Sequence, residues 1–143
     1  MQVQEIMNKD VVTVSPEVTV SEAAKRMVEK GTKFLIITKS ERLVGIVTEW
    51  DFVRKIAAEK EFKENSKIES IMTKRVIIIP PDTEISEAAE IMSSNNIKRL
   101  PIVANNVLVG VVTALELLAA EPKLIEQISE LFLTSGKQKS VAG

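Results

Sequence analysis

The sequence predicts an α+β fold in which two β-α-β-β-α repeats pack together with pseudo-two-fold symmetry. The chain matches itself. When Ile6 is placed on Ile71, roughly two fifths of the aligned residues are identical, without a gap, as far as Asp51 on Glu116. Each copy also carries the same succession of β-branched runs and helical periods. One copy has an apolar face too large to leave exposed, and a second copy can bury it.

Each copy begins with a short strand, which a proline ends and a helix follows. The β-branched runs Val11–Val14 and Val76–Ile79 predict these strands. In copy one, Thr19 and Glu22 have the spacing of a capping box, which satisfies free N–H groups at a helix start. Gly31 then stands where the helix is expected to stop.

Two further strands and a second helix complete each copy. The strand pairs flank the turns Lys39–Glu41 and Asn105–Asn106, and they are expected at residues 34–37 and 43–47, and at 100–103 and 107–112. The second helices are expected to start near Thr48 and Thr113, and that of copy one to reach about Lys60. The charged stretch Lys55–Lys67 is interpreted as a solvated helix face.

The repeats suggest three parts along the chain. Repeat 1 takes residues 1–65 and repeat 2 takes residues 66–122, with the boundary at Asn65–Ser66. Pro122 interrupts the last helix of repeat 2, and residues 123–143 form an amphipathic helix, with apolar positions from Leu124 to Phe132, and a polar tail.

The composition limits the chemistry that the chain can perform. Of its 143 residues 45% are apolar and only 3% aromatic, so the core must be aliphatic. A net charge of −1 argues against a nucleic-acid surface. The lack of Cys and His excludes most zinc sites and the usual nucleophile–histidine pairs. Since neither a membrane-spanning run nor a signal peptide is seen, we expect a cytoplasmic protein without a membrane partner.

The segments Gly45–Asp51 and Gly110–Glu116 are the strongest candidates for a site. Each has Gly, Thr and an acid at the same spacing, where a strand runs into a helix. A purely structural reading is that Thr caps the helix and the acid sits in its first turn. A functional reading is that the Thr hydroxyl and helix start meet a phosphate, while Asp51 accepts from two ribose hydroxyls. Recurrence in both copies favours the functional reading.

The repeat resembles the cystathionine-β-synthase (CBS) domain, and the chain resembles a tandem pair of them, a Bateman module, over roughly residues 5 to 120. The likeness rests on the Ile-Met that opens each copy, on Ser21–Ala24 and its repeat, on Lys98–Val103, and on the two Gly-x-x-Thr-x-x-acid segments. The resemblance implies a non-catalytic regulatory module that binds adenosine-containing ligands in the clefts between repeats and senses them for another protein.

The resemblance also assigns residues to two clefts. In the main cleft it places Asp51 on the ribose, Thr48 and Lys33 on the phosphate, and the adenine against Thr73, Val76, Ile77, Ile97 and Pro101. The second cleft would use Glu116, Thr113, Lys98 and Arg99 with Asn8, Val11, Val12 and Thr32. Glu116 stands where the family pattern has Asp, so a standard nucleotide pose is not expected there, although Lys98 and Arg99 could hold an anion.

The function expected is thus a sensor of AMP, ADP, ATP or S-adenosylmethionine, with no enzyme activity, no metal and no cofactor beyond this regulatory ligand. The alternative is a structural protein that binds no ligand and only dimerises or docks on a partner. An effector protein is expected but not identified. We also expect a homodimer, because the second helices of the two copies are too apolar to face water; the residues concerned are Phe52, Val53, Ile56, Ala57, Leu115, Leu117 and Leu118.

Overall fold

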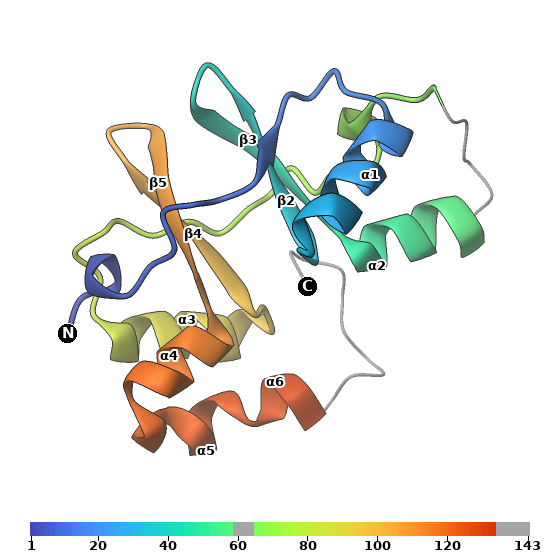
Figure 1. Ribbon diagram of the computed structural model, residues 1–143. Helices are drawn as coiled ribbons and strands as arrows, with labels where there is room; N and C mark the ends of the chain where they lie inside the picture. The colour runs from blue at the N-terminus through green and yellow to red at the C-terminus, as the bar shows by residue number, and fades with distance from the viewer. Residues whose placement is uncertain (59–64, 134–143) are drawn as a thin grey trace. The chain divides into compact units, whose positions relative to one another are not determined.

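The computed structural model describes residues 1–58 and 65–133, and these form two compact units (Figure 1). The unit that we call the Asp51 unit is Val11–Val76. The other, the Glu116 unit, combines Met1–Asp10 with the chain from Ile77 onward. Each unit therefore contains most of one repeat together with the opening segment of the other repeat.

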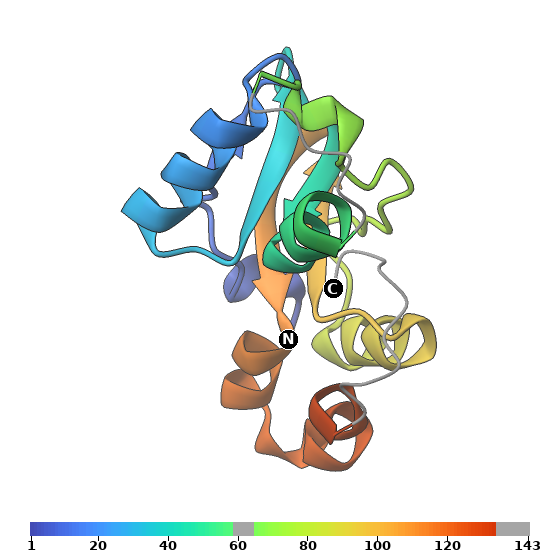
Figure 2. The ribbon, with the colours of Figure 1, turned by 90° about the vertical axis from the view of Figure 1, so that its right-hand side faces the viewer.

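The Asp51 unit is a three-stranded sheet with two helices beside it (Figures 1 and 2). The strands lie in the order β1-β2-β3, with β1 parallel to β2 and β2 antiparallel to β3; their bounds are Thr13–Val14, Phe34–Lys39 and Arg42–Thr48. Helix α1 spans Val20–Lys30, and α2 spans Glu49–Phe52 and continues as a π-helix over Val53–Ala58. Any continuation of this helix to Lys60 falls outside the described residues.

Sequence signals account for the bounds of α1. Thr19 is its N-cap and its hydroxyl accepts from the N–H of Glu22 at 3.1 Å, as the capping spacing predicts. Gly31 ends the helix with φ of 62°, a left-handed conformation that glycine adopts without strain. The buried face of α1 packs on an aliphatic core with the sheet, as the composition predicts; its buried members are Val20, Ala23, Met27, Leu35, Ile37, Val47, Ile68 and Ile71.

The Glu116 unit has a two-stranded sheet of β4 (Arg99–Ala104) and β5 (Val107–Thr113), which pair antiparallel. Its helices are α3 (Ile85–Asn95), α4 (Ala114–Ala120), α5 (Ile125–Ile128) and α6 (Glu130–Leu133). Figure 1 shows α3 and α4 between the sheet and the last two helices. From the first helix of each repeat onward, the element order expected from the sequence, helix, strand, strand, helix, is confirmed.

The predicted strand Val76–Ile79 is wrong except at its last residue. Only Ile79 pairs, through one parallel bridge to Ile102, with its N–H donating to the Pro101 carbonyl at 3.1 Å. The chain passes from one unit to the other between Val76 and Ile77, and Pro80 comes directly after Ile79. Because the run is divided between the units at one end and is followed by a proline at the other, only Ile79 pairs with a neighbouring strand. The first predicted strand is shortened in the same way, to Thr13–Val14.

The C-terminal segment differs from the single amphipathic helix that the sequence predicts. It forms a 3₁₀ turn, Pro122–Leu124, and then the two short helices α5 and α6. Leu124, Ile128 and Leu131 are buried against α3 and α4 in the core of the Glu116 unit. Leu117 is fully buried in the same core, so its predicted place on an exposed dimer surface is wrong. Among the described residues, every helix is too short or too polar to span a membrane.

Candidate functional site

In the Asp51 unit, four predicted site residues meet where β3 ends. Thr48 is the last residue of β3 and pairs in register with Phe34, next to Lys33. The Lys33 carbonyl accepts from the Glu49 N–H at 3.1 Å. Thr73 pairs with Ile46 through two backbone hydrogen bonds of 2.8 and 3.0 Å. The fold therefore brings Lys33, Thr48 and Thr73 to the strand end after which Asp51 lies.

Asp51 is 2% exposed, and each of its carboxylate oxygens has a different neighbour. Oδ2 accepts from the Thr48 N–H at 2.9 Å, which caps the start of α2. Oδ1 lies 3.6 Å from Nη2 of Arg54, beyond ordinary hydrogen-bond distance. Burial raises the pKa of Asp51 above its ordinary value of 3.8, while the Thr48 N–H and the charges of Lys55 and Arg54 oppose that rise.

Arg54 and Lys55 are functional candidates that the sequence analysis missed. Lys55 was assigned to a solvated face, but its ammonium donates to the Ile71 carbonyl at 3.2 Å. The Nε of Arg54 is buried and has no hydrogen-bond partner among the described residues. Both cations come after Asp51 at helical spacing, three and four residues on, and this spacing was the signal that could have found them.

The Glu116 unit repeats this arrangement at the end of β5. Glu116 Oε1 accepts from the Thr113 N–H at 2.9 Å, and the Glu116 N–H donates to the Thr113 hydroxyl at 3.3 Å. The Lys98 carbonyl accepts from Ala114, and Asn8 pairs with Val111 through two backbone hydrogen bonds. These are the equivalents of the contacts around Asp51. The pair Thr113–Glu116 is a complete capping box, as the structural reading of the segment predicts.

Lys98 has a neighbour that the sequence did not predict. Its ammonium lies 5.3 Å from the centre of the Phe132 ring, within the range of a cation–π contact. Phe132 belongs to α6, so the C-terminal segment reaches one of the cations that were assigned to the second cleft. The C-terminal segment therefore supplies an aromatic neighbour to a cation of the Glu116 unit.

The other predicted residues are divided between the units. Val76, Val11, Val12 and Thr32 are in the Asp51 unit, where the Thr32 hydroxyl donates to the Phe34 carbonyl at 3.0 Å. Ile77, Ile97, Pro101 and Arg99 are in the Glu116 unit, where Ile97 and Pro101 are buried. On the adenine side of the main cleft, only Thr73 and Val76 share a unit with Asp51.

The two glycines of the motif make room for the opening segments. A Cβ on Gly45 would lie 2.5 Å from Sδ of Met72 and 3.0 Å from the Thr73 carbonyl. A Cβ on Gly110 would lie 2.7 Å from Sδ of Met7 and 3.0 Å from the Asn8 carbonyl. The close approach expected at these strand ends is thus made by the chain itself, in both units.

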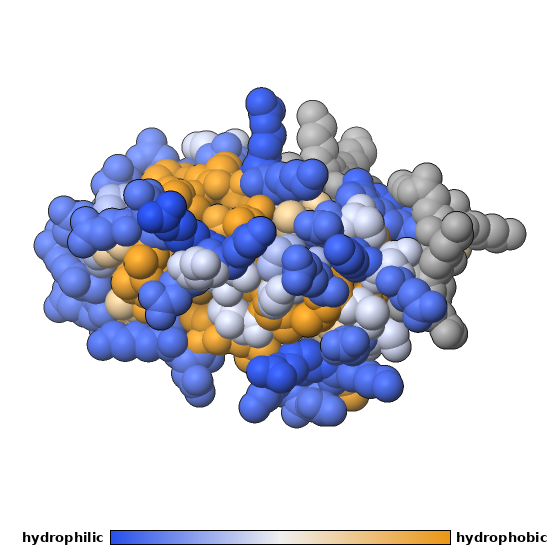
Figure 3. All heavy atoms as spheres, turned by 90° about the horizontal axis from the view of Figure 1, so that it is seen from above, coloured by the Kyte–Doolittle hydropathy of each residue, from blue (hydrophilic) through white to orange (hydrophobic). Residues whose placement is uncertain are grey.

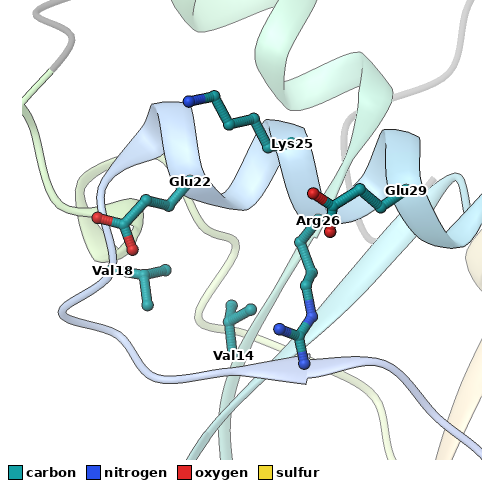
Figure 4. Close-up of a pocket in the computed structure, with 6 residues that line it drawn as sticks. All are labelled: Val14, Val18, Glu22, Lys25, Arg26 and Glu29. Atoms are coloured by element: carbon teal, nitrogen blue, oxygen red, sulfur yellow. The ribbon is translucent and has the colours of Figure 1, made fainter.

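A groove of about 240 Å³ lies between α1 and β1 of the Asp51 unit (Figure 4). Val14 and Val18 form its apolar part, while Glu22, Lys25, Arg26 and Glu29 come from α1. Figure 4 shows Arg26 extending from the helix towards β1 and Val14. Two acids and two bases balance in charge, and the predicted site residues are not among those that line it. We therefore do not assign the groove to the site.

Metal ligation finds no support in the described part of the chain. Groups of three or more acids that could hold an ion do not occur among residues 1–58 and 65–133. The polar groups that meet at the two strand ends are a carboxylate and a threonine, Asp51 with Thr48 and Glu116 with Thr113.

The family model for the CBS domain matches residues 3–58 and again residues 68–123. A relative described as an uncharacterized protein of Methanopyrus kandleri is 36% identical over 91% of this chain and 67% of its own length. The inosine-5'-monophosphate dehydrogenase of Methanocaldococcus jannaschii is 39% identical over 80% of this chain, which spans only 22% of that enzyme.

Among solved structures, the chain is similar to the CBS domain pair of protein MJ0100 in complex with 5-methylthioadenosine and S-adenosyl-L-methionine. The TM-score is 0.71 and the sequence identity 31%, and the match covers 94% of this chain and 98% of that one.

Proposed function

We propose, since this chain belongs to the CBS-domain family and carries the domain twice, that it is a non-catalytic regulatory module that binds an adenosine-containing ligand through Asp51. The similar pair that was solved with adenosyl compounds supports this class of ligand. In the dehydrogenase relative the matching region is a minor part of the enzyme, which supports a role apart from catalysis.

The observation that carries the proposal is that the Asp51 carboxylate is buried and that one of its oxygens, Oδ1, has no close hydrogen-bond donor among the described residues. A buried carboxylate is stabilised by hydrogen-bond donors, and Asp51 Oδ2 receives two from Thr48, the N–H at 2.9 Å and the hydroxyl at 3.5 Å. Its Oδ1 keeps acceptor capacity, because Arg54 stands 3.6 Å away. A ribose hydroxyl can donate to this oxygen. The Thr48 hydroxyl and the side chain of Lys33, whose backbone lies beside this strand end, would then serve the phosphate.

Glu116 is a weaker candidate for the same role. Its carboxylate accepts from the Thr113 N–H as that of Asp51 does from Thr48, but Glu116 is only half-buried and its helix α4 carries neither Lys nor Arg. The extra methylene of Glu also displaces the carboxylate from the position that the family pattern requires. We therefore propose Asp51 as the principal ribose ligand. The remaining residues of both clefts stay predictions from the resemblance.

Calorimetric titration with AMP, ADP, ATP and S-adenosylmethionine tests the proposal. We expect Asp51→Ala to weaken binding by about 1–3 kcal/mol, because it removes charge-assisted hydrogen bonds. Glu116→Ala, the matched change in the other unit, should have a smaller effect. Equal losses in the two variants, or no loss in Asp51→Ala, would sink the assignment of the site.

The alternative function is a structural protein that binds no ligand. It gains no support from the solved CBS pair, which was obtained with adenosyl compounds. A thermal shift distinguishes the two functions, because a ligand that binds only the folded state raises its stability by mass action. If none of the four compounds shifts the melting temperature, the alternative is the better account.

We also propose a cytoplasmic homodimer that passes its signal to a separate effector protein. Figure 3 shows apolar residues at the surface among hydrophilic ones. In the second helices of the two copies, Val53 is 51% exposed and Leu115 is 63% exposed. Sedimentation at micromolar concentration is the test. A species twice the 15.8 kDa of the chain is expected, and a clean monomer would contradict the dimer.

A further inference from the structure

Two cations stand close to Asp51 on its own helix. Arg54 Nη2 is 3.6 Å from Asp51 Oδ1, and Lys55 is held by the Ile71 carbonyl at 3.2 Å. Burial raises the pKa of Asp51, and both charges act in the opposite direction and lower it. The carboxylate and the two cations together carry a net charge of +1. A ligand bound at Asp51 therefore meets a positive environment.

The other unit has no such pair of cations on its helix. Alignment of Asp51 with Glu116 places Ala119 and Ala120 at the positions of Arg54 and Lys55. Helix α4, Ala114–Ala120, carries neither Lys nor Arg. The positive charge is thus a feature of copy one rather than of the repeated framework.

Arg54 also has donors that its present contacts do not use. Its Nε is buried without a hydrogen-bond partner among the described residues, and its contact with Asp51 is too long for a good hydrogen bond. Its side chain as a whole is 34% exposed, although Nε itself is buried. A guanidinium presents a planar fork of N–H groups that matches a phosphate better than an ammonium does.

We propose that Arg54 determines the specificity of the Asp51 site, by pairing with the carboxylate and donating to a phosphate, so that a phosphorylated adenosine ligand is preferred to an uncharged or sulfonium-bearing one. The inference rests on the proposed function, and it narrows the four candidate ligands to the nucleotides. A sulfonium would add a positive charge to a site that is already positive, whereas a phosphate is attracted to it.

The test compares AMP with adenosine, which differs from it only by the phosphate, and adds S-adenosylmethionine as the sulfonium probe. Calorimetric titration of the wild type should show AMP binding at least about tenfold more tightly than either other compound. Arg54→Gln should reduce the AMP-to-adenosine preference to about threefold or less, by weakening AMP and leaving adenosine unchanged or tighter. Arg42→Gln is the matched control, because Arg42 is exposed and lies at the opposite end of β3 from Thr48.

The possible outcomes separate this inference from the function on which it rests. If AMP and adenosine bind but their ratio in Arg54→Gln equals that of the wild type, Arg54 has no such role and the binding function stands. Tighter binding of S-adenosylmethionine than of AMP also overturns the inference. If no probe binds the wild type, the proposed function itself fails. Arg54→Lys, which keeps the charge without the fork, should lie between wild type and Arg54→Gln, and it provides a second variant if Gln impairs folding.

Discussion

The two units place the same motif at the end of a strand, yet its acid has different surroundings in each. Each acid closes a capping box with its threonine, but Asp51 is 2% exposed and has Arg54 and Lys55 near it, whereas Glu116 is half-buried. Backbone pairing to the opening segment is the same in both. The two copies therefore share a backbone framework, and they differ in the side chains that surround the acid.

The units also differ in the residues that follow the short helices α2 and α4. In the Glu116 unit, Leu124, Ile128 and Leu131 fold back and pack with α3 and α4. In the Asp51 unit, the second helix continues as the π-helix Val53–Ala58, which contains both cations. One copy has therefore gained apolar cover, and the other keeps polar groups beside its acid.

The largest effect is expected in the C-terminal segment that packs on the Glu116 unit. Ile128→Ala should lower the free energy of unfolding by about 2–5 kcal/mol, because it leaves a cavity in a fully buried position. Ile125→Ala is the control, since Ile125 is 51% exposed on the same helix and should cost about 0.5 kcal/mol or less. Urea denaturation measures both. Equal costs would mean that the C-terminal segment does not cover the Glu116 unit.

Gly45 and Gly110 have matching close contacts, so the same substitution should destabilise both units to a similar extent. Gly45→Ala and Gly110→Ala should each destabilise by about 1–3 kcal/mol, since the added Cβ collides with a methionine sulfur and presses on a carbonyl. Adding Met72→Ala to Gly45→Ala should cost less than the sum of the two single changes, because it removes part of the collision. Strict additivity would show that Met72 does not approach Gly45 in solution.

The pH dependence should single out Asp51. Its pKa is raised in the folded protein, mainly by burial, so the folded state binds this proton more tightly than the unfolded state does. The ionised carboxylate therefore costs stability at neutral pH, and this cost disappears as the pH falls through the raised pKa towards 3.8. The stability of the wild type relative to Asp51→Asn should rise from pH 7 to about pH 4. A difference independent of pH would contradict the burial of an ionisable Asp51.

The smallest effect concerns the hairpin turns. Both turns have two residues with φ between 52° and 66°, but these are Ser40–Glu41 in one unit and Asn105–Asn106 in the other. Asn tolerates this conformation better, so Ser40→Asn with Glu41→Asn should stabilise by about 0.5–1 kcal/mol. The reverse exchange at Asn105 and Asn106 should destabilise by a similar amount. Thermal denaturation of the two double variants measures the effect, and changes of the same sign would refute it.

Local signals in the sequence predicted most of the fold. The capping spacing at Thr19, the stop at Gly31 and the Asn105–Asn106 turn depend on residues close in the chain, and all three are confirmed. The pairing of Thr73 with Ile46 joins distant residues, and no local period encodes it. For the same reason, the sequence could not show that Val76–Ile79 passes between units or that Leu117 is covered.

The candidate site was predictable in part. The repeated spacing found Thr48 and Asp51, and the structure places Lys33 and Thr73 at the same strand end. Arg54 and Lys55 were overlooked because the stretch after Asp51 is rich in charge and was interpreted as solvated. Their helical spacing from a buried acid was the informative feature, since an acid inside a protein needs donors or cations close to it.

The number of nucleotides bound by each chain tests the central difference between the copies most directly. Native mass spectrometry with saturating AMP should find one AMP per chain in the wild type and one in Glu116→Ala. Asp51→Ala should need a severalfold higher AMP concentration to reach the same occupancy, because the proposed ribose ligand is then lost. Two AMP molecules per wild-type chain, or an AMP requirement in Asp51→Ala equal to that of the wild type, would contradict the account that only the Asp51 copy kept the binding chemistry.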